Sequence, residues 1–442
     1  MLLHRPLDFQ IVLDNVCDYH SALVAMAFAS LKSQKTTIKF VEKTPYLERM
    51  ASFLATGNIR CEWHGPVLTV VPSGSDPYDF TLRECEYEMF EYALAVAATR
   101  TGSKLALIDD IDDTIQMILF AFRRMGAEFE FVGGKNPHIV VRRSPQRGIK
   151  YHLGRGNAKI VPQLLLAMSA VKEKSEMFDL FESSRFDYIF EHFVEGFSRV
   201  NLLDANPEDE LEKRLRKRKP VKSEFRSRIA IELGVKDVES ELTLHPDTEL
   251  ASYLVAGVIH HPRARLVLRN YSREDVSTGP LSQLKHMGVD IEPSDHEGDP
   301  AHIVIRADLK ARTFAFEQLH DFPDALGALA LAGATAEGTS VFRSSLFNTP
   351  REEERQRRIC HVIRSLGVKI AEIKDGFVVE GKRELAPEEI KTEEDPICAM
   401  MSIAASLGTV NTLRVDDISP ARNRWGATLD RILQSIPITE HS

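Results

Sequence analysis

The sequence predicts an α/β fold in two lobes, each an inside-out barrel with helices inside and sheets around them. Two recurring patterns predict it. A small-residue apolar run followed by a β-type run recurs along the 442 residues, and so does an amphipathic helix followed by glycine and a hairpin. Together they make about six βαβαββ units. We expect three units per lobe, with pseudo-threefold symmetry.

The clearest unit spans residues 321–381. Its apolar run at 325–336 is followed by a β-type run at 339–342, a charged loop and an amphipathic helix at 352–366. Gly367 comes where a left-handed residue would end that helix. Two short strands should follow, with the turn between them at Asp375-Gly376.

The same order of elements recurs elsewhere. The Ala-rich runs carry few polar residues on any face, so these helices should be buried, while the second helices carry charge on one side and should lie outside. Further copies of the first half begin at Ser21, Phe90, Gln163 (a weaker copy), Ser252 and Ala399, and copies of the second half begin at Met50, Ile118, Leu281 and, in degenerate form, Tyr188.

Bulk composition narrows the class of protein. The chain is 43% hydrophobic and 27% charged, which is typical of a globular protein, and its net charge of −9 argues against broad nucleic-acid binding. No apolar stretch approaches the ~20 residues that span a bilayer, so we expect a cytoplasmic protein. The five cysteines include no CxxC pair, which favours reduced thiols over disulfides or zinc.

Two charged segments need a separate explanation. Residues 204–228 are acidic and then strongly basic, with Pro207 and Pro220 as breakers, and their sparse aromatic residues favour a solvated excursion over a nucleic-acid patch. The loop at 109–113 holds four aspartates that could bind a metal. It lacks EF-hand spacing and the glycine of that motif's turn, so a solvated loop is favoured and no metal site is assigned.

Motifs in the C-terminal half resemble the enolpyruvyl transferases, and among them the EPSP synthases most closely. Residues 323–325 (PDA), then an Ala-rich run and 337–339 (EGT), are similar to the family's PDA…GTT segment. Residues 350–355 (PREEER) fall at the family's VKE[ST]DR loop, and 246–253 (PDTELASY) resemble its GDASSASY turn. The order of units matches over nearly the whole chain.

The resemblance implies transfer of an enolpyruvyl group from phosphoenolpyruvate to a hydroxyl. This chemistry needs a base for the hydroxyl, an acid for the methylene carbon, and cations around phosphate and carboxylate. By resemblance Asp324 is the base and Glu352 the proton-transfer group. Structural alternatives stay open: Asp324 as a plain helix N-cap, and Glu352 as part of an ordinary acidic first turn.

Basic residues are assigned to substrate binding on the same grounds. Arg351 and Arg355 flank Glu352 and would hold phosphoenolpyruvate. Arg422 falls where the family has a lysine, although a surface arginine is an equal alternative. Lys159 is the one cation where the family has its SSQ phosphate site, and Arg185 completes the predicted set. We expect small anionic substrates as partners and no cofactor, nucleic acid or membrane. We also expect the protein to be a monomer.

The N-terminal half departs from the family. The turn at 13–21 lacks the Gly-Ser-Lys-Ser signature, and residues 83–88 are bulky and acidic where the family's backbone approaches phosphoenolpyruvate. The aspartates at 109–113 replace the loop of the RP arginine and would repel a trianionic substrate. Pro396 or Ile397 stands where the family has its DHR arginine. We therefore do not expect ordinary shikimate 3-phosphate chemistry.

Three functions stay open. The first is a divergent enolpyruvyl transferase with an unusual acceptor, and the second is an elimination on a cyclitol-type acid in the same cleft. The third is a non-catalytic binding or scaffold protein. By resemblance, residues 1–12 and 246–442 form the C-terminal-type lobe and residues 13–245 the N-terminal-type lobe, with hinges near Leu13 and His245.

Overall fold

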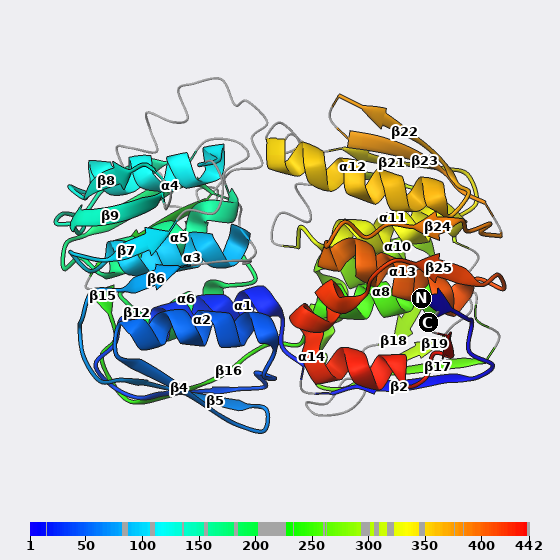
Figure 1. The fold of residues 1–442 in the computed structure, drawn as a ribbon, viewed down its shortest axis with the longest axis horizontal. Coiled ribbons are helices and arrows are strands. Elements are labelled where there is room, and N and C mark those ends of the chain that lie inside the picture. The colour runs from blue at the N-terminus through cyan, green and yellow to red at the C-terminus, as the bar shows by residue number, and fades with distance from the viewer. Residues whose placement is uncertain are drawn as a thin grey trace. The chain divides into compact units, whose positions relative to one another are not determined.

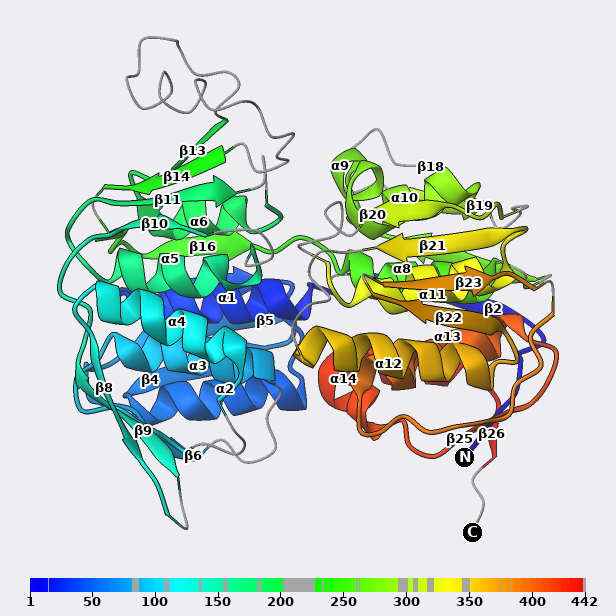
Figure 2. The same ribbon diagram turned by 90° about the horizontal axis from the view of Figure 1, so that it is seen from above.

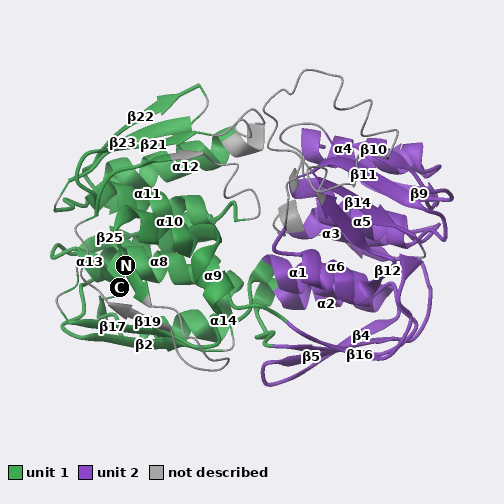
Figure 3. Ribbon diagram, turned by 180° about the vertical axis from the view of Figure 1, so that it is seen from behind, with its two compact units in different colours: residues 1–19, 40–46, 244–442 green, residues 20–39, 47–243 purple. Residues whose placement is uncertain are grey.

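The computed structural model contains two compact units (Figure 3). Unit 1 comprises residues 1–19, 40–46 and 244–442, and unit 2 comprises residues 20–39 and 47–243. The predicted lobe of residues 13–245 was continuous, whereas in the structure residues 40–46 belong to unit 1. The structure describes residues 1–439 except for residues 15, 82–86, 107–110, 135–136, 154–157, 181–183, 202–226, 233, 260, 262, 293–300, 305–308, 316–321, 344–349, 375 and 383.

Six four-stranded sheets among the described residues confirm the predicted repeat, three in each unit. In every sheet the first two strands are parallel and the other two continue antiparallel, as a βαβαββ unit requires. The sheets of unit 1 are β2 (Phe9–Leu13), β17 (Ala264–Leu268), β19 (Ala301–Val304) and β18 (Asp290–Glu292); β20 (Thr313–Ala315), β21 (Thr339–Arg343), β23 (Gly376–Glu380) and β22 (Lys369–Ile373); and β24 (Glu389–Ile390), β25 (Leu413–Val415), β1 (Leu2–Leu3) and β26 (Ile438–Thr439).

Unit 2 repeats this arrangement and adds the short pair β12 (Val194–Glu195) and β15 (Gly234–Val235). Its four-stranded sheets are β16 (Ser240–Thr243), β3 (Thr36–Lys39), β5 (Val67–Pro72) and β4 (Ile59–His64); β6 (Asp79–Thr81), β7 (Lys104–Ala106), β9 (His138–Arg143) and β8 (Glu128–Val132); and β10 (Lys150–His152), β11 (Ser175–Leu180), β14 (Ser227–Ile231) and β13 (Ser198–Asn201).

Two strands are exchanged between the units along the chain. Strand β2 precedes a helix of unit 2 but pairs with β17 in unit 1, while β16 precedes a helix of unit 1 but pairs with β3 in unit 2. The chain crosses between the units after β2 and again after β16. In the third sheet of unit 1 the N-terminal strand β1 lies between β25 and the C-terminal β26, so the two ends of the chain share one sheet.

Each unit encloses three apolar helices, as the Ala-rich runs predicted. In unit 1 the three pack against one another (Figures 1 and 2), and their side chains are almost wholly buried. These central helices are α8 (Thr248–Val258), α11 (Ala325–Thr335) and α13 (Pro396–Gly408) in unit 1, and α1 (Tyr19–Ala29), α3 (Tyr87–Ala98) and α5 (Val161–Ser169) in unit 2. The inside-out α/β fold is therefore present in both units.

Amphipathic helices make up the second half of each repeat. Gly367 has the left-handed φ of 73° after α12, which confirms the predicted helix end, and β22 and β23 form the predicted hairpin. The remaining helices are α9 (Arg273–Ser277), α10 (Gly279–Met287), α12 (Pro350–Ser365) and α14 (Ser419–Leu433) in unit 1, and α2 (Pro45–Thr56), α4 (Asp113–Arg124), α6 (Asp187–Phe193) and the 3-10 turn η1 (Ala158–Ile160) in or at the edge of unit 2. Within the described part of the chain, no helix combines the length and apolarity needed to cross a membrane.

Glycine lets α8 and α13 approach closely at their C-terminal halves. A Cβ on Gly257 would come 2.4 Å from the carbonyl oxygen of Ala404, and a Cβ on Gly408 would come 2.6 Å from that of Gly257. Backbone atoms at these contacts cannot yield as a flexible side chain would. The close approach therefore depends on glycine on both helices.

Replacing Gly257 with alanine should destabilise unit 1. Overpacking of this kind costs about 2 kcal/mol, which corresponds to a fall in Tm of roughly 4–8 °C in a unit of this size. Gly133→Ala is the control, because nothing lies within 4 Å of a Cβ built there. Thermal unfolding followed by circular dichroism measures both variants. Equal Tm values would show that α8 and α13 can separate at little cost.

Candidate active site

Asp324 immediately precedes α11 in unit 1, and its side chain is only 1% exposed. It has helical backbone angles and its side chain makes no capping hydrogen bond, which overturns the simple N-cap interpretation. Instead, Arg424 Nη2 donates to Asp324 Oδ2 at 2.6 Å, and Arg355 Nη2 lies 3.1 Å from Oδ1. Two guanidinium groups therefore compensate one buried carboxylate.

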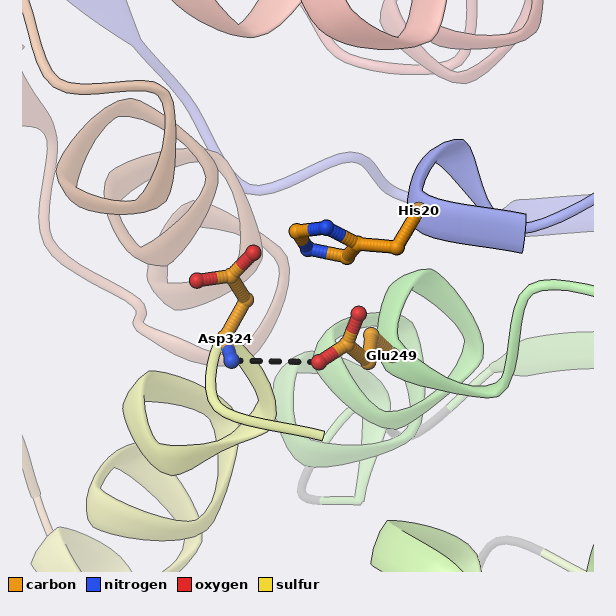
Figure 4. Close-up of side chains that lie close together, drawn as sticks. All are labelled: His20, Glu249 and Asp324. Atoms are coloured by element: carbon orange, nitrogen blue, oxygen red, sulfur yellow. Dashed lines mark hydrogen bonds between the residues drawn. The ribbon is translucent and has the colours of Figure 1, made fainter. Parts of the chain in front are cut away.

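The backbone of Asp324 is fixed by two residues of α8. The Asp324 N–H donates to Glu249 Oε1 at 3.1 Å (Figure 4), and the Tyr253 hydroxyl donates to the Asp324 carbonyl at 2.5 Å. Glu249 is itself 1% exposed, and its Oε2 lies 4.0 Å from Arg424 Nη2. The two central helices therefore hold the carboxylate in one position.

Asp247 begins α8 beside this group. One carboxylate oxygen accepts from the Leu250 N–H at 2.8 Å, as an N-cap does, and the other accepts from Trp425 Nε1 at 3.0 Å. Burial, and the charge of Asp18 next to it, raise the pKa of Asp247 to about 6. A large fraction of this carboxyl group is therefore neutral in mildly acidic solution.

Three buried acids gather at this helix start. Asp18, Asp247 and Glu249 each offer one carboxylate oxygen, and these oxygens lie within 4.8 Å of one another. Such a set could hold a metal ion, but acidic groups also cluster without one. With Asp324, the cluster makes this part of unit 1 strongly acidic.

A kink in α14 brings Arg424 and Trp425 into the site. Gly426 has φ 52° and ψ −135° within the helix, and a Cβ there would lie 3.2 Å from the Lys43 carbonyl oxygen. Before the kink, the Arg424 guanidinium lies over the rings of Tyr19 and Trp425, at 5.1 and 5.0 Å from their centroids. Arg424 is therefore held by ring faces as well as by Asp324.

Comparisons with known proteins agree with this fold. A sequence model of EPSP synthase (3-phosphoshikimate 1-carboxyvinyltransferase) matches residues 220–427. The 3-phosphoshikimate 1-carboxyvinyltransferase of Streptococcus uberis is 25% identical over 66% of this chain and 64% of its own length. That of Synechocystis is 32% identical over 36% of each chain. The aligned part of this chain thus spans less than two thirds of the length of these curated relatives.

Solved structures extend the match to nearly the full chain. An EPSP synthase from Acinetobacter baumannii has a TM-score of 0.73 at 17% identity and covers 99% of both chains. The enolpyruvyl transferase NikO from Streptomyces tendae has a TM-score of 0.74 at 15% identity over 100% of this chain and 99% of its own. In sequence, residues 220–427 of this chain thus resemble the EPSP synthases. In fold, nearly the whole chain is similar to the solved enolpyruvyl transferases.

Of the residues predicted from this enolpyruvyl transferase resemblance, the structure brings Asp324 and Arg355 together. Arg351 and Glu352 lie in the first turn of α12, where their side chains are outside the described residues. Arg422 lies on α14 with 48% of its side chain exposed, and its Nε pairs with Asp430 at 3.1 Å rather than with Asp324. The predicted catalytic and binding roles remain predictions.

The predicted binding residues of the N-terminal-type lobe lie in unit 2. Lys159 is in the turn η1, and the Arg185 guanidinium lies 4.8 Å from the centroid of the Phe186 ring. In the acidic loop, Asp112 caps α4 by accepting from the Ile115 N–H at 2.8 Å, which is a structural role. Residues 109–110 of that loop, 82–86 of the acidic turn and 202–226 of the charged excursion lie outside the described residues.

Sequence reasoning missed several residues of the site. Asp247 and Glu249 lie within the 246–253 motif used for the family resemblance, but acidic residues at a helix start are common at the surface. Arg424 lies two residues beyond the arginine that was chosen, and Trp425 follows it. One signal was available: Asp247 and Glu249 stand at the start of an otherwise apolar helix. Because buried acids need partners, they indicate that basic or hydrogen-bond-donating side chains lie nearby.

Arg424 and Arg422 form a matched pair for a stability test. Arg424→Gln leaves a buried carboxylate with one guanidinium fewer, which should cost about 3 kcal/mol and lower Tm by roughly 6–12 °C. Arg422→Gln should change stability by no more than about 0.5 kcal/mol, because its partner Asp430 is exposed. Thermal unfolding of both variants measures this, and equal shifts would contradict the assignment of Arg424 to the buried pair.

Asp247 should make stability depend on pH. Because its pKa is raised from 3.8 to about 6, the folded protein binds the proton more tightly than the unfolded chain. This contribution is fully present below pH ~4 and is lost as pH rises through ~6. Asp247→Asn keeps an acceptor for the Leu250 N–H and removes the titration. The stability of the wild type relative to this variant should fall by on the order of 1 kcal/mol per pH unit across the window.

Thermal unfolding of both proteins from pH 4 to 7, with a chelator present, measures this difference. Parallel curves for wild type and Asp247→Asn would show that Asp247 does not titrate in this range.

Proposed function

We propose that this protein transfers an enolpyruvyl group from phosphoenolpyruvate to a hydroxyl of an acceptor less negative than shikimate 3-phosphate. The resemblance to the enolpyruvyl transferases supports the reaction class. The single observation that carries the site is the buried carboxylate of Asp324 between Arg355 and Arg424. In this proposal the protein is a cytoplasmic monomer that acts on small anionic substrates without a cofactor.

Asp324 would serve as the base. Its carboxylate takes the proton of the acceptor hydroxyl while the acceptor oxygen bonds to C2 of phosphoenolpyruvate, and the methylene carbon takes a proton from the acid, which the sequence assigns to Glu352. The tetrahedral adduct then loses phosphate from C2 and returns a proton from the methyl carbon to the Glu352 carboxylate, while the proton held by Asp324 leaves on the phosphate. The products are the enolpyruvyl ether of the acceptor and inorganic phosphate, so atoms and charges balance.

The pairing of Asp324 with two guanidiniums suits this sequence of steps. While Asp324 is ionised, Arg355 and Arg424 compensate its charge. When Asp324 takes the proton, it becomes neutral and both guanidiniums can turn their positive charge toward the anionic adduct. Proton transfer and stabilisation of the adduct would thus be coupled through the same three side chains.

The acidic cluster limits the acceptor. Asp18, Asp247 and Glu249 lie at the start of α8, and Glu249 contacts the Asp324 backbone. A unit negative charge ~4 Å from an added phosphate charge costs ~4 kcal/mol at the effective dielectric constant of a protein surface. A neutral or cationic acceptor avoids this repulsion, whereas a phosphorylated one does not. This is the physical reason for an acceptor other than shikimate 3-phosphate.

The same cluster favours a second candidate. If the acids and the engaged arginines exclude phosphoenolpyruvate altogether, Asp324 could still act as a base in an elimination from a cyclitol-type acid. In the absence of any reaction the protein would be a binding member of the family. These alternatives differ from transfer in whether phosphoenolpyruvate is consumed.

The experiment is a ¹H NMR assay of phosphoenolpyruvate mixed with a panel of hydroxyl compounds: shikimate 3-phosphate, shikimate, an uncharged polyol and an amino alcohol. Transfer predicts loss of the free vinyl signals, new enol ether signals and release of phosphate with an uncharged or cationic acceptor, and none with shikimate 3-phosphate. Consumption of shikimate with intact vinyl signals would indicate elimination instead. No consumption of any compound would favour a binding protein.

Asp324→Asn tests the base. We expect turnover to fall ~10²- to 10⁴-fold, since the amide cannot accept the hydroxyl proton. Asp430→Asn is the matched control, because it removes an exposed carboxylate of the same unit, and it should keep wild-type turnover. Wild-type turnover in Asp324→Asn would remove Asp324 from the mechanism.

A further inference from the structure

A cavity of about 170 Å³ lies in unit 1 where the three central helices end. Gly257 of α8, Leu331 of α11 and Ala405 of α13 line it, each in the last two turns of its helix. The candidate active site is at the opposite ends of α8 and α11. Since a helix rises 1.5 Å per residue, the two places are ~15 Å apart. The cavity is therefore separate from the site already described.

Two oppositely charged side chains stand on the lining of this cavity, Arg5 and Glu384. Arg5 is half-buried in the segment between β1 and β2, and Glu384 is exposed in the segment between β23 and β24. Neither has a hydrogen-bond or ion-pair partner among the described residues. Both side chains are therefore available to a ligand that enters the cavity.

The rest of the lining is mostly apolar, with two threonines, Thr335 and Thr409. Leu331 and Leu385 give alkyl surface. The last turns of three helices meet at the cavity, and each helix end carries partial negative charge on its free carbonyl groups. The lining thus offers one site for an anionic group, at Arg5, and several for a hydrogen-bond donor or ammonium group.

Size excludes larger ligands. Clefts for drug-sized molecules usually measure ~300–1,000 Å³, so a nucleotide or a coenzyme would not fit inside. A guanidinium binds a carboxylate through two parallel hydrogen bonds, and an ammonium group suits both Glu384 and helix carbonyls. We propose that this cavity binds a free α-amino acid with an apolar side chain, its carboxylate on Arg5 and its ammonium group toward Glu384.

The position of the cavity sets the consequence of binding. An amino acid there lies at the far ends of α8 and α11, so it does not compete with substrates at Asp324. Because it binds the folded unit, it raises the stability of unit 1 in proportion to its occupancy. Its binding is independent of whether the protein transfers an enolpyruvyl group.

L-leucine is the probe, titrated by calorimetry into the full-length protein. The variants are Arg5→Gln and Glu384→Gln, with Lys369→Gln as the control for loss of a charge, since Lys369 pairs with Glu380 on the exposed hairpin of β22 and β23. We expect saturable binding to the wild type, at least tenfold weaker binding to both variants, and a change of less than twofold in the control.

Two analogues test the zwitterion directly. 4-Methylpentanoate keeps the alkyl chain and carboxylate, and 3-methylbutylamine keeps the chain and amine. Each should bind at least tenfold more weakly than L-leucine. Circular dichroism and Tm verify that the variants fold. The analogues are titrated into the wild-type protein, so that this test does not depend on the folding of any variant.

The proposal would be overturned if L-leucine did not saturate the protein at ~10 mM, a concentration above the ~1 mM Kd of a weak ligand. Binding of either analogue as tight as that of L-leucine would also overturn it. So would unchanged L-leucine binding in a folded Arg5→Gln protein. None of them bears on the transferase reaction, which is assayed without amino acids.

Discussion

The buried carboxylate of Asp324 is the constraint on which the rest of unit 1 depends. An ionised group at 1% exposure needs compensation, and it receives it from Arg355 of α12 and Arg424 of α14. Glu249 and Tyr253 of α8 hold its backbone. Elements from three different repeats therefore have to meet at one point. Arg424 lies two residues before the kink at Gly426 in α14.

Repetition made the architecture predictable. The order of small-residue helix, strand, charged helix and hairpin is a local property of the sequence, and it predicted six sheets, buried central helices and the left-handed Gly367. The crossings near Leu13 and His245 were expected only from the family resemblance, and the return of residues 40–46 to unit 1 was not predicted, because both depend on contacts between residues far apart in the chain. Strand pairing over such distances leaves little local trace.

Part of the site was predictable from the family resemblance. Asp324 and Arg355 lie in motifs shared with the family. Arg424 was not chosen, although it lies two residues from Arg422. Side chains two apart on a helix point in different directions, and the sequence pattern did not show which of the two faces the core. Glu249 was missed because an acid in a first helical turn usually faces solvent. Burial, which decides both cases, comes only from tertiary packing.

The negative charge of the site is the basis for the acceptor proposed for this protein. Four carboxylates gather within unit 1, and the two arginines of the described site both face Asp324. In the reaction proposed above, a proton neutralises the base as an anion forms, and the carboxylates repel a substrate with a second phosphate. The raised pKa of Asp247 relieves part of the charge.

The most direct test of this account is calorimetric titration of phosphoenolpyruvate into the wild-type protein and Arg355→Gln at low salt, alone and with shikimate 3-phosphate. The account predicts saturable binding of phosphoenolpyruvate that weakens at least tenfold in the variant and is not strengthened by shikimate 3-phosphate. No binding to the wild type, or equal binding to Arg355→Gln, would contradict a donor site at Asp324.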